Sequence, residues 1–165
     1  MIMVDACFEG AVAAHHWHLC KGRKYYRRWI YPGAGVQLGE MLHDFVFRLA
    51  HGSSPQPPLS VDHIDGNTRN NTASNLRPAT QRLQGLNQRS RTDRGLPRGV
   101  TRKSDRYRSR PYAAKIADQG RRKHLGYFAT PEEAAAVYAS ALADEIAKEE
   151  AKSWELFRNQ KEGDR

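Results

Sequence analysis

The stretch V-D-H-I-D-G-N-T-R-N-N-T-A-S-N-L-R-P-A-T, residues 61–80, places an acid beside a histidine and then runs through an Asn-rich segment. A strand that ends at His63, a turn in which Gly66 relieves the backbone, and a return strand would form an antiparallel hairpin. The hairpin would bring Asp62, His63 and the return-strand residue Asn75 to one end. With a following helix, the stretch predicts a ββα unit.

These three side chains carry complementary chemistry. A carboxylate binds a hard divalent cation, a neutral imidazole accepts a proton from water near pH 7, and an amide fixes the orientation of the imidazole. The alternative is an Asx-rich turn with a hydrogen-bonded histidine, and any one of the residues alone would favour it. Together they favour a metal-assisted phosphodiester hydrolase.

The same residues resemble the signature of the HNH endonucleases of phages and homing elements, in which a D-H pair precedes an Asn-rich loop and an N-L-R segment. The resemblance implies that His63 is the general base, that Asp62 is a metal ligand, and that Asn75 is a catalytic residue that supports the histidine. It also implies one divalent cation per site, Mg²⁺ or Mn²⁺, and cleavage of double-stranded DNA.

One position departs from that family. Where the family has an Asn on the helix that follows Thr80, this chain has Gln84, whose amide oxygen stands on a longer arm. Asn87 lies one turn further along the same helical face. We expect Gln84 to be the second metal ligand, with Asn87 as its substitute. The change also leaves open a catalytically silent, sequence-specific DNA-binding protein.

The positive charge is concentrated in one part of the chain. The 165 residues carry a formal net charge of +9, yet the segment 77–123 holds 15 Lys or Arg and only three acids, so the rest of the chain is slightly acidic. A cationic surface with interleaved tyrosines fits nucleic acid better than a lipid surface, and an ordinary solvated basic face is the alternative. The charge pattern predicts a DNA partner.

The basic segment has the pattern of a small sheet followed by a helix. Strand-like pieces cover Gly99–Lys103, Pro111–Ala117 and Lys123–Phe128, separated by turn sequences. Thr130 and Glu133 form a capping box around Pro131 at the first helical position. The helix then has an apolar stripe that fits the back of a three-stranded antiparallel sheet: Ala134, Tyr138, Ala141, Leu142 and Ile146. The sequence leaves open whether Trp154 and Phe157 continue the helix.

This segment is similar to the Apetala-two-type (ethylene-response factor) DNA-binding domain, on R-G-V at its start, Y-A-A-K-I, L-G-Y-F, and T-P-E-E-A-A at the helix start. The resemblance implies that the sheet enters the major groove of duplex DNA. The positions available for contacts with phosphates and base edges are Arg98, Arg102, Lys103, Arg108, Arg110, Lys115, Arg121 and Arg122.

The region before the hairpin contains aromatic and basic clusters that suggest short strands, followed by an amphipathic helical pattern from Leu38 to Leu49 that Gly52 ends. His43 on that helix resembles a position of the HNH family, either as a phosphate contact or as a hydrogen-bonded packing residue. The histidines at positions 15, 16 and 18 lack a further carboxylate or Cys partner, which disfavours a metal cluster.

The chain has no apolar run near the roughly 20 residues that cross a bilayer, and its two cysteines, Cys7 and Cys20, are too few for a disulfide framework. We therefore expect a soluble protein of the cytoplasm, bacterial or in a phage-infected cell, that acts without a membrane as a monomer or a homodimer. The predicted fold class is α+β, with a support region 1–58, an HNH unit 59–90, a linker 91–97 and a DNA-binding domain 98–165.

Overall fold

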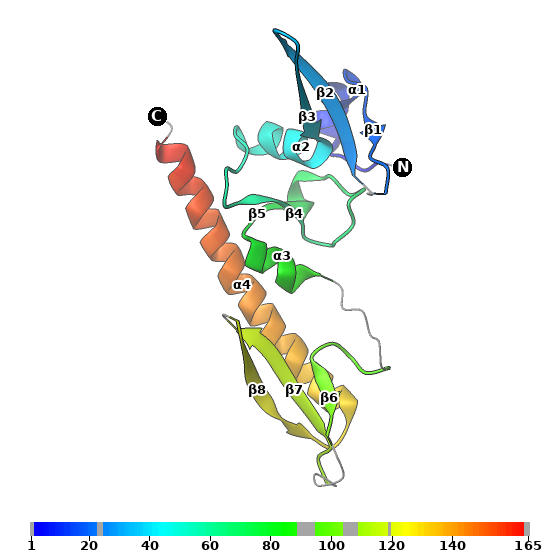
Figure 1. Cartoon of the computed structure of the whole chain (residues 1–165), viewed down its shortest axis with the longest axis vertical. Coiled ribbons are helices and arrows are strands. Elements are labelled where there is room, and N and C mark those ends of the chain that lie inside the picture. The colour runs from blue at the N-terminus through cyan, green and yellow to red at the C-terminus, as the bar shows by residue number, and fades with distance from the viewer. Residues whose placement is uncertain (1, 23–24, 89–94, 104–108, 119, 164–165) are drawn as a thin grey trace. The chain divides into compact units, whose positions relative to one another are not determined.

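The computed structural model of the chain describes residues 2–22, 25–88, 95–103, 109–118 and 120–163 (Figure 1). The structure is mixed, with three small antiparallel sheets and several helices, in agreement with the predicted α+β class. Within the described residues, no helix combines the length and the apolar character that crossing a membrane needs. Cys7 and Cys20 are free thiols.

The chain divides into two compact units. Unit 1 consists of Met1–Asn87 together with Glu149–Arg165, and unit 2 is Gln88–Lys148. The predicted C-terminal domain, 98–165, therefore differs from the observed unit 2 because the last part of the chain groups with unit 1. The last part of the chain groups with unit 1 because Trp154 and Phe157 pack against Phe47. The spacing of residues in the sequence does not indicate this contact.

Unit 1 begins with a 3-10 turn, η1 (Ala6–Phe8), and a short helix, α1 (Glu9–Ala13). A three-stranded antiparallel sheet follows, in the order β1-β2-β3. Its strands are β1 (His18–Leu19), β2 (Tyr26–Gly33) and β3 (Val36–Met41). Figure 1 shows β2 and β3 as a long hairpin.

The helix after this sheet is shorter than its sequence pattern indicates. Helix α2 spans Leu42–His51, and Gly52 ends it in the left-handed region with φ of 81°. Leu38 and Met41, which we predicted as helical, belong to β3, where they pair with Ile30 and Arg27. Because period 2 and period 3.6 coincide over a few residues, strand pairing with β2 decided this boundary.

The hairpin and helix predicted from residues 61–80 are present. Strand β4 (Ser60–His63) pairs antiparallel with β5 (Leu76–Ala79), and α3 (Gln81–Asn87) follows. Gly66 has a φ of 69° in the connecting turn, and the Thr80 Oγ1 accepts a hydrogen bond from the Leu83 N–H at the start of α3. Asn75 lies in a 3-10 turn, η2 (Ala73–Asn75), and not in the return strand.

The core of unit 1 joins α2, the β4–β5 hairpin and the C-terminal part of α4 (Pro131–Gly163). Phe47 is fully buried and Phe157 is 3% exposed. Their ring centroids are 5.3 Å apart in an edge-on arrangement, and Trp154 stacks on Phe47 at 6.1 Å. Trp154 and Phe157 therefore continue the helix and also pack into the core of unit 1.

Unit 2 contains the predicted three-stranded sheet. Its strands are β6 (Val100–Arg102), β7 (Tyr112–Asp118) and β8 (Arg121–Phe128), antiparallel in that order. The Thr130 Oγ1 accepts a hydrogen bond from the Glu133 N–H, so the predicted cap begins α4. The residues that pack together between sheet and helix include Val100, Ala114, Ile116, Ala134 and Tyr138.

Candidate active site

Asp62 lies near the end of β4, opposite Arg77 on β5. Its Oδ2 accepts hydrogen bonds from the Arg77 Nε at 3.3 Å and Nη2 at 3.1 Å. Arg77 is only 1% exposed, and its Nη1 donates to the Glu150 Oε2 on α4 at 3.0 Å. The Arg77 guanidinium thus lies between two carboxylates. Their negative charges compensate its buried positive charge, which would be costly without a partner.

Helix α3 brings an amide to the same carboxylate, but from Asn87. The Asn87 Nδ2 donates to the Asp62 Oδ2 at 3.1 Å and to the His63 carbonyl oxygen at 2.8 Å. Gln84, the residue that we expected there, donates to the Ser60 Oγ at 2.6 Å. Gln84 thus contacts the start of β4, whereas Asn87, one turn further along α3, contacts its end. The structure places the substitute Asn87, and not Gln84, beside Asp62.

His63 is 4% exposed, and its Nε2 lies 3.2 Å from the Asn71 Oδ1. Asn71 is 1% exposed, and its Nδ2 donates to the Thr68 carbonyl oxygen at 3.4 Å. Because the amide nitrogen faces a carbonyl, the amide oxygen faces the imidazole, and a neutral His63 must carry its proton on Nε2. The lone pair is then on Nδ1, which is the arrangement of a base.

The surroundings of His63 also affect its charge. Burial lowers the pKa of His63 below its ordinary value, and the hydrogen bond to Asn71 and the negative charges of Asp62 and Asp65 oppose this effect. The net direction is downward, so the imidazole is neutral near pH 7. A neutral imidazole is the form that can accept a proton.

Asn75 has a different position from the one that we predicted. Its Oδ1 accepts from the Asp65 N–H at 3.0 Å, and its Nδ2 donates to the Asp65 Oδ1 at 2.9 Å and to the Asn70 carbonyl oxygen at 2.7 Å. Asn75 therefore holds the two ends of the loop together, and the amide that contacts the imidazole is that of Asn71. The sequence pattern offered four Asn residues in this stretch and no means of choosing between them.

Two further rings surround His63. The His43 ring centroid lies 5.2 Å away in an edge-on arrangement, and the Tyr25 centroid lies 6.2 Å away. Burial and then the neighbouring His63 lower the pKa of His43 to about 3. His43 is thus a neutral packing partner of the candidate base, which agrees with the packing alternative. Its role was not evident from sequence because α2 and β4 are separated by a linker.

Comparison with known proteins bears on the same region. Residues 40–86, which include α2, the β4–β5 hairpin and most of α3, match the family described as HNH endonuclease. Residues 40–86, which this family model matches, are called the HNH domain below. The match begins before residue 59, where we placed the start of the HNH unit, and it includes α2.

The chain is also similar to a protein named as an uncharacterised HNH endonuclease of Acanthamoeba polyphaga mimivirus, to which it is 31% identical over 136 residues. The aligned part covers 82% of this chain and 64% of the relative, so the chain spans less than two thirds of that protein's length. No solved structure matches the chain.

The donor groups of the HNH domain suit a hard cation. The Asp62 carboxylate and the His63 carbonyl both present an oxygen to the Asn87 Nδ2, and oxygen is the donor that Mg²⁺ and Mn²⁺ prefer. The Asn87 amide oxygen would join these two only if the amide group turned over. The partly positive amide NH₂ of Asn87 lies between two oxygens, as a cation would. Among the described residues no group of three or more His, Cys, Asp or Glu could hold a metal, so His15, His16 and His18 form no such centre.

The predicted DNA-contact residues outside the HNH domain do not share one face of the sheet. Ala114 and Ile116 on β7 face α4, so Lys115, which lies between them, points to the opposite face of the sheet. Arg122 on β8 lies opposite Ala117, which shares the face of Lys115, so Arg122 points to that face as well. Arg102 lies two residues from buried Val100 and therefore shares its face toward α4. Arg121 lies opposite Asp118 in the register of β7 and β8, on that same face. Of the described strand residues among these positions, Lys115 and Arg122 lie on the face away from α4, and their contact with DNA stays a prediction.

The remaining predicted contacts lie elsewhere. The Arg98 Nη1 donates to the Gln88 carbonyl oxygen at 2.7 Å, Lys103 follows β6 and is half-buried, and Arg110 precedes β7 and is exposed. Arg108 and part of the predicted linker 91–97 lie outside the described residues. Sequence reasoning missed His124 and Tyr127, whose pairing with Lys115 and Ala113 puts them on the outer face.

Proposed function

We propose that this protein is a divalent-metal-dependent endonuclease of the homing or phage type that hydrolyses phosphodiester bonds in double-stranded DNA. The observation that carries the proposal is the His63–Asn71 contact, which leaves Nδ1 as the basic atom of a neutral imidazole. The match of residues 40–86 to the HNH endonuclease family supports the same chemistry.

In the proposed mechanism, His63 accepts a proton at Nδ1 from the water that attacks phosphorus, while Asn71 holds the ring through Nε2. Asp62 and Asn87 would hold the cation, and Arg77 keeps the carboxylate in place. When bound, a divalent cation stabilises the negative charge that develops in the transition state. The family resemblance implies 5′-phosphate and 3′-hydroxyl products.

The first test is incubation of the full-length protein with supercoiled plasmid in Mg²⁺ or Mn²⁺. We expect nicked or linear plasmid, and we expect a chelator to abolish the reaction because it removes the cation that would stabilise the negative charge of the transition state. Gel electrophoresis separates the forms. Cleavage that is unaffected by the chelator would contradict the metal dependence.

A second candidate function is DNA binding without cleavage. It is favoured by the Asp62 Oδ2, which Arg77 and Asn87 already occupy, and by Gln84, which turns toward Ser60. In this case the same plasmid would be retarded on the gel and remain supercoiled in the presence of either metal. The single assay therefore separates the two functions.

The positioning role of Asn71 can be tested with Asn71→Asp. A carboxylate facing Nε2 stabilises the charged imidazole, so the pKa of His63 should rise and the acidic limb of the pH profile for kcat/KM should move to higher pH. DNA affinity should stay unchanged. A second variant, Asn71→Leu, should leave Nε2 without an acceptor, which costs about 1–3 kcal/mol of folding stability. Cleavage should also fall, because the contact that orients the ring is lost. An unshifted pH profile in Asn71→Asp would argue against this role.

We further propose that the sheet of unit 2 targets the enzyme to duplex DNA, as an Apetala-two-type domain would. Each phosphate neutralised by a cation contributes about −0.9 to the slope of log K against log salt. The double variant Lys115→Ala/Arg122→Ala should therefore reduce the slope by up to about 1.8, measured by fluorescence anisotropy in chelator.

Lys123→Ala is the matched control for this sheet. Lys123 lies opposite Ile116, whose side chain faces α4. Lys123 is therefore on the other face of the sheet from Lys115 and Arg122. The control should change the slope less than the double variant. An equal effect of both would contradict our assignment of the contact face.

A further inference from the structure

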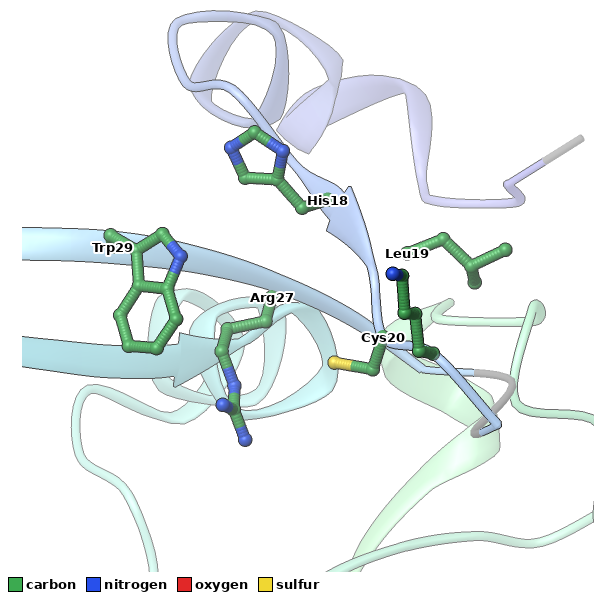
Figure 2. A pocket seen from close by; sticks show the side chains of 6 residues that line it. His18, Leu19, Cys20, Arg27 and Trp29 are labelled. Atoms are coloured by element: carbon green, nitrogen blue, oxygen red, sulfur yellow. The ribbon is translucent and has the colours of Figure 1, made fainter.

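The N-terminal sheet of unit 1 carries a pocket that the proposed reaction does not use. It has a volume of about 450 Å³ and is lined by His18, Leu19, Cys20, Lys21, Arg27 and Trp29. Figure 2 shows Arg27 and Trp29 extending to the same side of β2, with Cys20 facing them. The described residues that line it include the two cations Lys21 and Arg27 and no acid, so the pocket is suited to an anion.

Arg27 differs from its neighbour Arg28 in the way its charge is compensated. Arg28 forms an ion pair with Glu40 at 2.6 Å and lies over the Phe45 ring, so it belongs to the framework. Arg27 lies over the Trp29 ring at 5.3 Å. Its Nε is buried and has no hydrogen-bond partner within the described part of the chain. A buried donor without a partner is costly, which is typical of a group that an absent ligand would satisfy.

The opposite strand leaves room for this pair of side chains. Gly39 is directly opposite Trp29 in the sheet. A Cβ at position 39 would lie 2.9 Å from the Arg27 Cδ and 3.2 Å from the Trp29 ring. Arg27 and Trp29 therefore lie flat across β3 because residue 39 has no side chain. Trp29 is nevertheless 43% exposed, so its ring remains open to a ligand.

The pocket is connected to the candidate active site through Tyr25. The Cys20 N–H donates to the Tyr25 carbonyl oxygen at 2.9 Å, and the Tyr25 ring lies beside those of His43 and His63. A second hollow of about 600 Å³ shares His18 and Trp29 and continues along β2 to Tyr31. Cationic and aromatic side chains thus continue along β2 from the end of the sheet at which Tyr25 contacts the candidate base.

We propose that this surface, formed by His18, Lys21, Arg27 and Trp29, binds the phosphate backbone of the DNA substrate beside the cleavage site. Arg27 and Lys21 would contact phosphates, with Trp29 against a sugar or base. The inference rests on the proposed function for its choice of DNA as the polyanion. It gives unit 1 a DNA contact of its own, separate from the sheet of unit 2.

The test uses the full-length protein, a mixed-sequence duplex oligonucleotide and a chelator that prevents cleavage. Fluorescence anisotropy is measured over a range of salt concentrations. We expect Arg27→Ala and Lys21→Ala each to weaken binding by about 3- to 10-fold and to reduce the salt slope by about 0.9, the value for one phosphate contact. Lys21 is exposed, so its variant tests the surface even if Arg27→Ala fails to fold.

Arg158→Ala is the matched control, because it removes the same charge from an exposed position of α4 in the same unit. It should bind like the wild type. In addition, DNA should quench the fluorescence of Trp29, so Trp29→Phe should lose that part of the quenching. Wild-type affinity and slope in Lys21→Ala, with unchanged quenching in Trp29→Phe, would overturn the inference.

The binding test and the cleavage test can fail separately, so the DNA-binding surface and the nuclease activity are judged independently. If the wild-type protein cuts plasmid and the variants bind normally, the surface assignment fails and the enzyme assignment stands. If the wild-type protein does not cut and the variants bind more weakly, the surface is a DNA contact of a protein without nuclease activity.

Discussion

His63→Ala should lose cleavage activity by about 10² to 10⁴, the usual contribution of a general base. The variant lacks the neutral imidazole whose Nε2 is held by Asn71, which is the group that the proposed mechanism uses as the base. Its affinity for DNA in chelator should equal that of the wild type, since the imidazole is 4% exposed and offers little surface for binding. Single-turnover cleavage of plasmid measures the rate.

Arg158→Ala, the exposed variant on α4, is also the control for this variant. Arg158 lies outside the candidate site and outside the proposed DNA-binding surface, so its variant should cut at a rate close to the wild type. Circular dichroism should show that His63→Ala is folded, and His63→Gln provides a second variant of similar size. A wild-type rate in both His63 variants would remove the base from the mechanism. A parallel loss of rate and affinity would make His63 a DNA contact.

Arg77→Ala should lower the free energy of unfolding by about 3 kcal/mol, because removing one member of a buried ionic network leaves the others unpaired. The Arg77 side chain is 2% exposed and lies between Asp62 and Glu150. Chemical denaturation monitored by tryptophan fluorescence gives the stability. The same variant frees the Asp62 carboxylate, so cleavage should fall even at temperatures where the protein remains folded.

Glu150→Gln tests the other end of this network. Its side chain is 32% exposed, so water screens the interaction, and the loss in stability should be about 1 kcal/mol or less. The ratio of the two effects is the informative quantity. If Arg77→Ala unfolds at the same denaturant concentration as the wild type, the contacts of Arg77 contribute nothing measurable to stability.

Local sequence signals predicted much of the architecture. The Gly66 turn, the start of α3 after Thr80, the capping box of α4 and the three strands of unit 2 all depend on neighbours a few residues apart. The HNH domain was predicted in the same way, because its D-H pair and Asn-rich loop lie within one short stretch. Such signals are reliable when backbone conformation and chain spacing alone determine the outcome.

The details of the candidate site depended on contacts between distant segments. Whether Asn71 or Asn75 meets His63, and whether Gln84 or Asn87 meets Asp62, follows from the loop path and from the position of α3 along β4. These residues have the same side-chain chemistry, so composition could not separate them.

The sequence by itself determined the elements of this protein, the type of domain and the chemical groups available for catalysis. Only the tertiary structure decided which amides face the histidine and the carboxylate, and that Arg77 connects Asp62 to Glu150 on a helix some 70 residues later. The physical reason is that local conformation depends on near neighbours, whereas the burial and pairing of polar groups depend on how separate segments pack.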